Sequence, residues 1–152
     1  MIKIYTDGSC WSKTRVGGAG VFIYDEDNDI EYKLRKGYRE TTISRCELHA
    51  AIIGLKAIRN KRKRITLFSD SMYVVNMINQ KWIEKWKLIN FEGKANSDLV
   101  KELGKEYSKF KIKPKFKHIK GHTKGNTIDE IGNIEADRLA DFKTHKKYYL
   151  DK

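Results

Sequence analysis

The sequence is poor in cysteine and proline and contains no long apolar run. Only two of its 152 residues are cysteine, and one is proline. Cys10 and Cys46 are too few for a disulfide framework and lack the spacing of a metal-binding pair, so reduced thiols are favoured. No segment reaches the roughly 20 apolar residues that span a bilayer. The opening residues, MIKIYTDG, lack the apolar core of a secretory signal, so a cytoplasmic protein is expected.

The charge of the chain is strongly of one sign. Thirty-two Lys and Arg stand against 20 Asp and Glu, which gives a net charge of +12. A field of that sign favours polyanions, with nucleic acid first and anionic membranes second, although a basic protein without either partner stays possible on charge alone. The length and the 39% hydrophobic content fit one globular domain over residues 1–152.

Apolar periodicity predicts an α/β chain. Strands are expected at residues 2–6, 21–24, 30–38, 65–70 and 113–120, the last with basic residues on one face. Helices are expected at 44–60, 71–79, 97–110 and from a Thr-x-x-Glu capping box at 127 through 142. The first helix has Leu48, Ile52, Leu55 and Ile58 at helical spacing. This order predicts a mixed sheet with helices on its faces.

Four carboxylates occupy positions of interest. Asp7 and Asp70 follow apolar runs at IYTD and LFSD, and neighbouring parallel strands end at the same edge of a sheet. Glu47 is expected in the first turn of its helix and Asp137 in the last helix. Each has a structural explanation when taken alone: a turn or cap for the aspartates after strands, a charge near a helix N-terminus for Glu47, and a solvated face for Asp137.

Taken together, the four acids favour metal chemistry. Clustered carboxylates repel one another unless protons or cations neutralise them. Oxygen ligands suit hard divalent cations such as Mg²⁺. Two such ions about 3.5–4 Å apart can activate a water and stabilise the leaving oxygen of a phosphodiester. In a basic protein this combination predicts nucleic-acid hydrolysis, provided that the fold brings the acids together.

Six motifs give the chain a resemblance to type 1 ribonuclease H, in the family's order and over nearly the whole chain. They are TDGSC, GGAG, TISRCELHAAIIGL, FSDSMYVV, KHIKGH and NIEADRLAD. The resemblance implies an α/β ribonuclease H-like fold with a five-stranded mixed sheet flanked by helices. It also implies endonucleolytic cleavage of the RNA strand of RNA–DNA hybrids with two Mg²⁺ ions, for which Mn²⁺ is an expected substitute. The products would carry 5′-phosphate and 3′-hydroxyl ends.

The resemblance also implies roles for catalytic residues. Asp7, Glu47, Asp70 and Asp137 match the family's metal-binding carboxylates. His122 matches a histidine on a loop that assists proton transfer or product release. Its ordinary pKa near 6.5 suits proton exchange near neutrality. Core packing or solvent is the better explanation for the remaining histidines, which are His49, His118 and His145.

Further positions match substrate contacts of the family. Those near the RNA strand are main-chain groups around Gly8, Ser9 and Cys10, the segment Ser44-Arg45-Cys46, and Lys13, which stands near the position of an asparagine that often contacts RNA. Those near the DNA strand are Thr42, Asn96 and the segment 81–96, a shortened form of the family's basic handle with Lys85, Trp86, Lys87 and Lys94. Trp86 and Phe91 are expected against deoxyribose, and Trp82 partly in the core.

Several departures from the family pattern stand out. Ile43-Ser44 stands where family members commonly have two asparagines. Lys13 stands near the position of a further asparagine that often contacts RNA in the family. Glu84 and Glu92 dilute the charge of the handle, so hybrid binding is expected to weaken or to spread to other lysines, such as Lys13 or those of the KRKR segment at 61–64. The loop after His122 is longer than usual. Its Asp129 and Glu130 are expected to cap the last helix rather than to perturb the metal site.

Three rival interpretations are open. The chain could be another nuclease or strand transferase of the wider superfamily, but the ordered motifs and the handle disfavour this. It could be a non-catalytic hybrid-binding module, but all four acids are present. It could be a fragment of a reverse transcriptase, which Met1 disfavours. We expect a monomer that removes primers in DNA replication or clears hybrids elsewhere.

Overall fold

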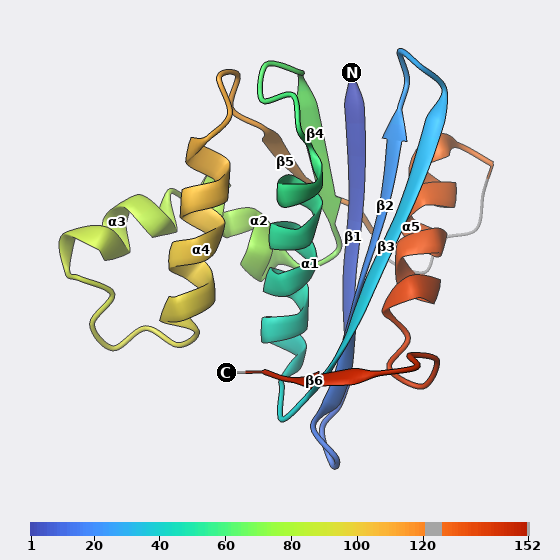
Figure 1. The fold of residues 1–152 in the computed structure, drawn as a ribbon. Coiled ribbons are helices and arrows are strands. Elements are labelled where there is room, and N and C mark those ends of the chain that lie inside the picture. Colours follow the sequence, from blue (N-terminus) through green and yellow to red (C-terminus); the bar gives the residue numbers. More distant parts are fainter. Residues whose placement is uncertain (121–125, 152) are drawn as a thin grey trace.

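The computed structural model describes residues 1–120 and 126–151 and shows an α/β fold (Figure 1). Within these residues the strands form one six-stranded sheet in the order β5-β4-β1-β2-β3-β6. The strands are β1 (Ile2–Trp11), β2 (Val16–Asp25), β3 (Ile30–Arg39), β4 (Ile65–Ser69), β5 (Lys115–His118) and β6 (Tyr148–Leu150). The helices are α1 (Ile43–Ala57), α2 (Met72–Asn79), α3 (Trp82–Leu88), α4 (Ser97–Ser108) and α5 (Ile128–Ala140).

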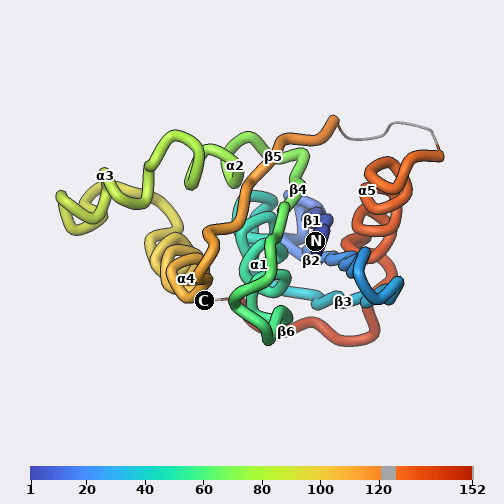
Figure 2. Tube along the Cα trace, turned by 90° about the horizontal axis from the view of Figure 1, so that it is seen from above, coloured from blue at the N-terminus to red at the C-terminus, as the bar shows by residue number. Residues whose placement is uncertain are grey.

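The sheet is mixed, as predicted. Strands β1, β2 and β3 form an antiparallel meander, whereas β4 runs parallel to β1, β5 parallel to β4, and β6 parallel to β3. Helix α1 makes the crossover between β3 and β4. Seen from above, α1 and α4 lie on one side of the sheet and α5 lies on the other (Figure 2). The sheet is therefore the middle of three layers.

Each face of the sheet has its own hydrophobic cluster. The larger cluster lies under α1 and α4 and includes the fully buried Ile4, Leu48, Leu55 and Leu67. The periodicity that predicted α1 is thus confirmed as its core-facing side. The smaller cluster lies under α5 and contains Tyr5, Phe22, Phe68 and Ala136.

The first strand is longer than predicted, and Asp7 does not end it. Strand β1 continues to Trp11, with Asp7 opposite Gly20 in the antiparallel pair with β2. The expected Asp-Gly turn is therefore wrong. The segment TDGSC consists of small and polar residues without apolar alternation, so its sequence does not indicate a strand. Pairing with β2 keeps the segment extended.

The sheet also has one strand more than the five predicted. Strand β6 has three residues, and it pairs with Gly37–Arg39 at the end of β3. A run this short, following a lysine-rich segment, carries no periodicity from which a strand could be recognised.

The predicted cap of the last helix is half right. The hydroxyl of Thr127 accepts a hydrogen bond from the Glu130 amide at 3.2 Å and donates one to the Glu130 carboxylate at 2.9 Å. Asp129 instead accepts a hydrogen bond from the Tyr5 hydroxyl at 2.5 Å. Asp129 therefore ties α5 to the sheet.

None of the helices in the described residues has both the length and the apolar character needed to cross a bilayer.

Candidate active site

Three of the four predicted acids come together where the pairing of β1 with β4 ends. Asp7 in β1, Glu47 in α1 and Asp70 directly after β4 each place a carboxylate oxygen within 4.8 Å of the other two. Asp7 and Glu47 are buried, with 5% and 7% of their surfaces exposed, and Asp70 is half-buried. The fold thus forms the cluster that the sequence alone left open.

Strand pairing and one glycine explain this geometry. The parallel pairing of β1 with β4 ends at Thr6 and Ser69, so the next residues are the two aspartates. Helix α1 packs directly on Gly8, where a Cβ would lie only 2.6 Å from the Glu47 amide nitrogen. The absence of a side chain at Gly8 therefore lets α1 come close enough for Glu47 to reach Asp7.

Glu47 lies further into its helix than predicted. Helix α1 begins at Ile43, with Thr42 as its cap, and it has no acid in its first turn. Glu47 is therefore in the second turn, where the favourable effect of the helix N-terminus is weak. The structural explanation proposed for Glu47 from the sequence does not apply.

Burial and crowding disfavour the charged forms of the carboxylates in this cluster. Burial, then the charges of Glu47 and Asp70, raise the pKa of Asp7 well above its usual range. Burial, followed by the charge of Asp70, likewise raises the pKa of Glu47. The Gly8 amide donates to Asp7 Oδ1 at 2.8 Å, but Glu47 Oε2 is buried without a hydrogen-bond partner in the described residues.

This arrangement fits a hard divalent cation. The ligand atoms are all carboxylate oxygens, and neither Asp7 nor Glu47 has a described Lys, Arg or His within ion-pair distance. A bound cation would give the unpartnered Oε2 of Glu47 a partner and offset the repulsion among the acids.

Asp137 lies at the rim of this cluster. It is an exposed residue of α5 and does not belong to the group within 4.8 Å. Its negative charge nevertheless contributes to the raised pKa of both Asp7 and Glu47, after the larger effects of burial and of the nearer acids. The fold therefore places all four predicted acids in one region.

The histidines have different surroundings. His122 lies outside the described residues. His118 is exposed, with Nε2 3.2 Å from the main-chain oxygen of Asp70. His49 is half-buried, contacts Asp151 at 2.9 Å and stacks on Tyr38.

Among the positions predicted to face RNA, Ser9 and Cys10 have side chains that already make contacts within the protein. The Ser9 hydroxyl donates to Ala140 O at 2.6 Å and accepts from the Phe142 amide at 2.9 Å. The Cys10 thiol lies 3.8 Å from Thr41 O. Their main-chain groups, on which the prediction rests, lie beyond the point where the pairing of β1 with β4 ends. Lys13 is exposed between β1 and β2, and Ser44 is half-buried.

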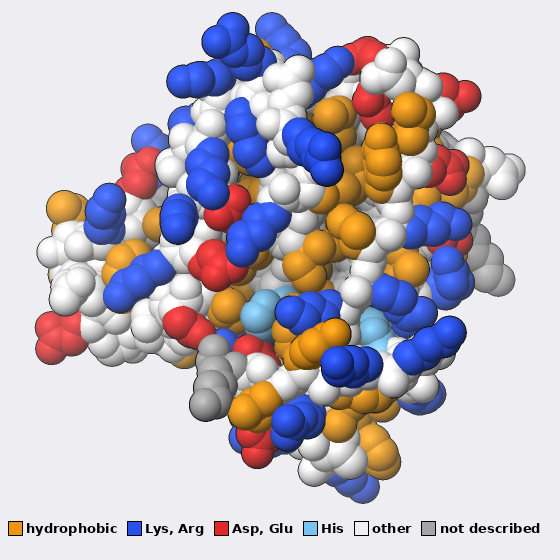
Figure 3. Space-filling view, viewed as in Figure 1, with side chains coloured by type: hydrophobic (Ala, Val, Ile, Leu, Met, Phe, Trp, Pro, Cys, Tyr) orange, Lys and Arg blue, Asp and Glu red, His pale blue; other side chains and the backbone are white. Residues whose placement is uncertain are grey.

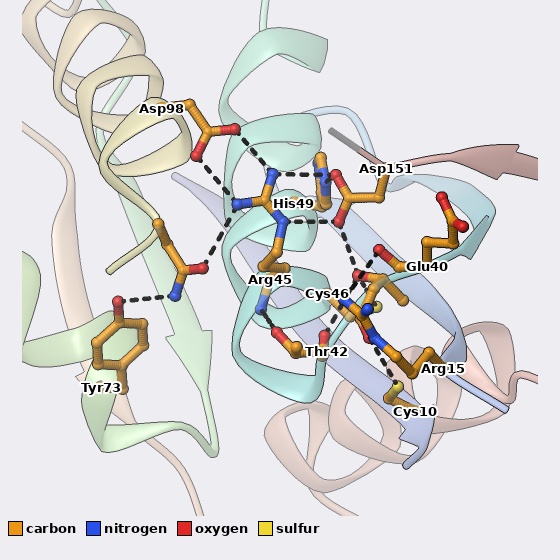
Figure 4. A network of polar contacts seen from close by, with 12 residues as sticks. Cys10, Arg15, Glu40, Thr42, Arg45, Cys46, His49, Tyr73, Asp98 and Asp151 are labelled. Carbon is orange, nitrogen blue, oxygen red and sulfur yellow. Dashed lines mark hydrogen bonds and ion pairs between the residues drawn. The ribbon is translucent and has the colours of Figure 1, made fainter. Parts of the chain in front are cut away.

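Arg45 has a structural role that the sequence did not reveal (Figure 4). Its guanidinium donates to Asp98 at 3.0 and 2.8 Å, to Asp151 at 2.9 and 3.1 Å, and to Asn96 Oδ1 at 3.4 Å. The Asn96 amide in turn donates to the Tyr73 hydroxyl at 3.2 Å. This side chain is therefore fully engaged within the protein.

The segment 81–96 projects from the sheet as α3 and the loop after it (Figure 1). Trp82 and Trp86 are both half-buried and stack with centroids 5.5 Å apart, so the expectation that Trp82 lies partly in the core is confirmed. Lys94 Nζ lies 4.9 Å from the centre of the Trp86 ring. Phe91 is 9% exposed and belongs to the core, so its predicted contact with deoxyribose is wrong.

The positive charge is not confined to that segment. Lys85 and Lys87 of α3 are exposed. Figure 3 shows lysine and arginine side chains at many places on the face that carries α1 and α4, with hydrophobic and acidic side chains between them. A polyanion would therefore meet positive charge well beyond α3.

Comparisons with known proteins agree in family and fold. The family model described as RNase H matches residues 1–144. The ribonuclease H of Caldicellulosiruptor saccharolyticus is 41% identical over 140 residues, which cover 86% of this chain and 92% of that protein. The ribonuclease HI of Haemophilus ducreyi is 38% identical over 141 residues, with coverage of 89% and 90%.

Two solved structures share the fold at low identity. The crystal structure of LC9-RNase H1, a type 1 RNase H with the type 2 active-site motif, has a TM-score of 0.71 at 21% identity and covers 93% of this chain and 74% of that one. The prototype foamy virus protease-reverse transcriptase has a TM-score of 0.77 at 22% identity, over 91% of this chain and 20% of that one.

Proposed function

Since the chain belongs to the ribonuclease H family, we propose that it is a metal-dependent endonuclease that hydrolyses the RNA strand of RNA–DNA hybrids. The observation that carries the proposal is the cluster of Asp7, Glu47 and Asp70 at the end of the parallel β1–β4 pair. The proposal is supported by Glu47 Oε2, which is buried, has no hydrogen-bond partner among the described residues, and is therefore available to a cation.

In this proposal the protein holds the cations and orients the substrate. Asp7, Glu47 and Asp70 would hold the cations, with Asp137 as a further ligand on the rim. Two bound Mg²⁺ ions, or Mn²⁺ in their place, supply the charge that favours attack by water on the phosphorus and departure of the 3′ oxygen. Burial of Asp7 and Glu47 keeps bulk water from competing for their oxygens. His122 would assist either proton transfer or product release.

The substrate would lie across the part of β1 beyond its pairing with β4 and across the segment 81–96, which contains α3. Main-chain groups of Gly8, Ser9 and Cys10 face the RNA strand, whose 2′-hydroxyls distinguish it from DNA. Thr42, Asn96 and the side chains of Lys85, Trp86, Lys87 and Lys94 hold the DNA backbone, which positions the hybrid without reading its sequence. In this proposal residues 1–152 act as one monomeric, cytoplasmic domain with 81–96 as its substrate-binding segment, and cleavage leaves 5′-phosphate and 3′-hydroxyl ends.

The decisive experiment compares substrates and metal. The purified protein is incubated with an end-labelled RNA–DNA hybrid, duplex DNA and duplex RNA, each with Mg²⁺ and with a chelator. We expect cleavage of the RNA strand of the hybrid alone, and only with Mg²⁺. Survival of that strand with Mg²⁺, or unchanged cleavage with chelator, would contradict the proposal.

A further inference from the structure

A charged groove lies on the α5 side of the sheet. Helix α5 packs on β1, β2 and β3, so β4 and β5 extend past it (Figure 2). The groove has a volume of about 620 Å³ and is lined on one wall by Lys115, Lys117 and Lys120. Asp129 and Glu130 of α5 line the facing wall.

The lysines form an ordered row on an edge strand. Lys115 pairs with Thr66 and Lys117 with Phe68, and all four residues line the groove, whereas the intervening Phe116 is buried in the core. The strand geometry sets the two lysines about 7 Å apart on one face. This is the strand whose one-sided basic pattern was visible in the sequence, and the proposed function leaves it unexplained.

The lysines of the positive wall form no ion pair within the described residues. Lys115, Lys117 and Lys120 are exposed, and no described carboxylate lies within 4 Å of their amines. The acids of the facing wall already have partners: Asp129 accepts from the Tyr5 hydroxyl and lies 3.8 Å from Lys3 Nζ, and Glu130 accepts from Thr127. The groove therefore attracts an anion to its β5 side.

The groove ends beside the candidate active site. His118 and Ile119 line it. The His118 ring contacts the main-chain oxygen of Asp70 at 3.2 Å, and the Ile119 amide donates to Ser69 O at 2.9 Å. A nucleic-acid strand that leaves the carboxylate cluster past Asp70 thus meets the row of lysines directly.

We propose that this groove binds the phosphate backbone of a single-stranded extension of the hybrid held at the active site. The inference rests on the proposed function, which supplies a polyanion beside Asp70. The occupant follows from the charge of the groove, since lysines spaced along a strand meet successive phosphates without reading bases. The enzyme would consequently prefer junctions between hybrid and single strand over blunt hybrids.

The test uses the double variant Lys115→Gln with Lys117→Gln in the full chain. Binding is measured by fluorescence anisotropy without divalent metal, on a blunt hybrid and on the same hybrid extended at each of its four strand ends. The matched control is Lys105→Gln with Lys111→Gln, which removes two exposed lysines that lie outside the groove and have no ion-pair partner among the described residues.

We expect wild-type protein to bind at least one extended hybrid about tenfold more tightly than the blunt one, as two phosphate contacts would provide. The variant should lose that preference, and its salt dependence on the extended hybrid should fall by about one to two counterions between about 50 and 200 mM salt. The control should keep the preference. Cleavage of the blunt hybrid should be unchanged in both variants.

Two results would overturn the inference. One is equal binding of blunt and extended hybrids by wild-type protein, and the other is an equal loss of affinity for both in the variant. A poly-glutamate peptide that competes for the groove where a single-stranded oligonucleotide does not would instead indicate an acidic protein partner. Cleavage of the blunt hybrid by wild-type protein reports on the proposed function separately, so the two failures are distinguishable.

Discussion

The guanidinium of Arg45 and the carboxylate of Asp151 form a two-point ion pair, in which Nε and Nη2 donate at 2.9 and 3.1 Å. Only 2% of the Asp151 side chain is exposed, and Thr41 and His49 complete its hydrogen bonds. Asp98 occupies the other edge of the guanidinium. Arg45 therefore joins the segment after β6 to the starts of α1 and α4 (Figure 4).

Removing this buried carboxylate should destabilise the protein strongly. Asp151→Ala leaves the partly buried Arg45 with only the exposed Asp98 as an ion-pair partner and removes the hydrogen bonds of Thr41 and His49 to Asp151, and breaking a buried pair costs about 3–5 kcal/mol. The measurement is the free energy of unfolding in urea. Asp27→Ala is the matched control, because Asp27 forms exposed ion pairs with Lys63 and the N-terminus, which contribute about 0–1 kcal/mol. Equal losses in the two variants would contradict this view of Asp151.

The same pair should make stability depend on pH in acid. Burial alone would raise the pKa of Asp151, but hydrogen bonds from Arg45, Thr41 and His49 outweigh it and lower the pKa from 3.8 to about 2. The stabilisation is therefore fully present above pH about 4 and is lost as the pH falls through about 2. The stability difference between wild type and Asp151→Asn should shrink over that range. A difference that stays constant down to pH 2 would argue against the assignment.

Asp70→Asn tests the carboxylate cluster. Losing one charged ligand should lower cleavage by about a thousandfold or more, because cation charge supplies several kcal/mol of transition-state stabilisation. Hybrid affinity, measured by anisotropy with chelator, should stay near that of wild type. Asp141→Asn, beyond the end of α5, serves as the control and should remain active. Near-normal cleavage by Asp70→Asn would exclude it as a ligand.

Asp7→Asn should stabilise the metal-free protein. Burial beside Glu47 and Asp70 raises the pKa of Asp7, so folding at neutral pH must either protonate this carboxylate or bury its charge against the repulsion of its neighbours. A neutral isostere removes that cost, which is worth about 1–2 kcal/mol. The melting temperature in chelator should therefore rise, while the further rise on adding Mg²⁺ should shrink. A lower melting temperature in chelator would mean that the hydrogen bond from Gly8 to Asp7 matters more than the repulsion.

Trp86→Ala tests the α3 segment. Trp86 stacks on Trp82, lies under Lys94 and packs, only partly buried, against the edge of the core, so its loss mainly removes a surface for the DNA strand. The hybrid concentration at half-maximal rate should rise about tenfold, in line with stacking contacts of 1–3 kcal/mol, with little change in the maximal rate. Equal damage to both parameters would indicate that Trp86 is structural.

The features that could be predicted from the sequence are those that depend on local periodicity and on the positions of strand ends. The apolar face of α1 and the gathering of Asp7 with Asp70 follow from short-range patterns and the behaviour of parallel strands. The continuation of β1 through TDGSC was missed because its partner β2 maintains it. Asp151 was missed because its partner Arg45 lies 106 residues earlier, and no local signal marks such a pair. Contacts between residues far apart in the chain cannot be identified from local patterns in a single sequence.

The distance along the chain between Asp7 and Asp70 has a consequence for folding. Their side chains meet only after α1 has crossed over and β4 has paired with β1, which is a non-local step that partly folded chains lack. A cation held by this cluster therefore has no comparable site in the unfolded chain. By mass action it would add about 2.7 kcal/mol to stability at a hundred times its Kd. The divalent ion would thus act as a folding ligand, shielding the native chain from proteolysis whether or not a hybrid is present.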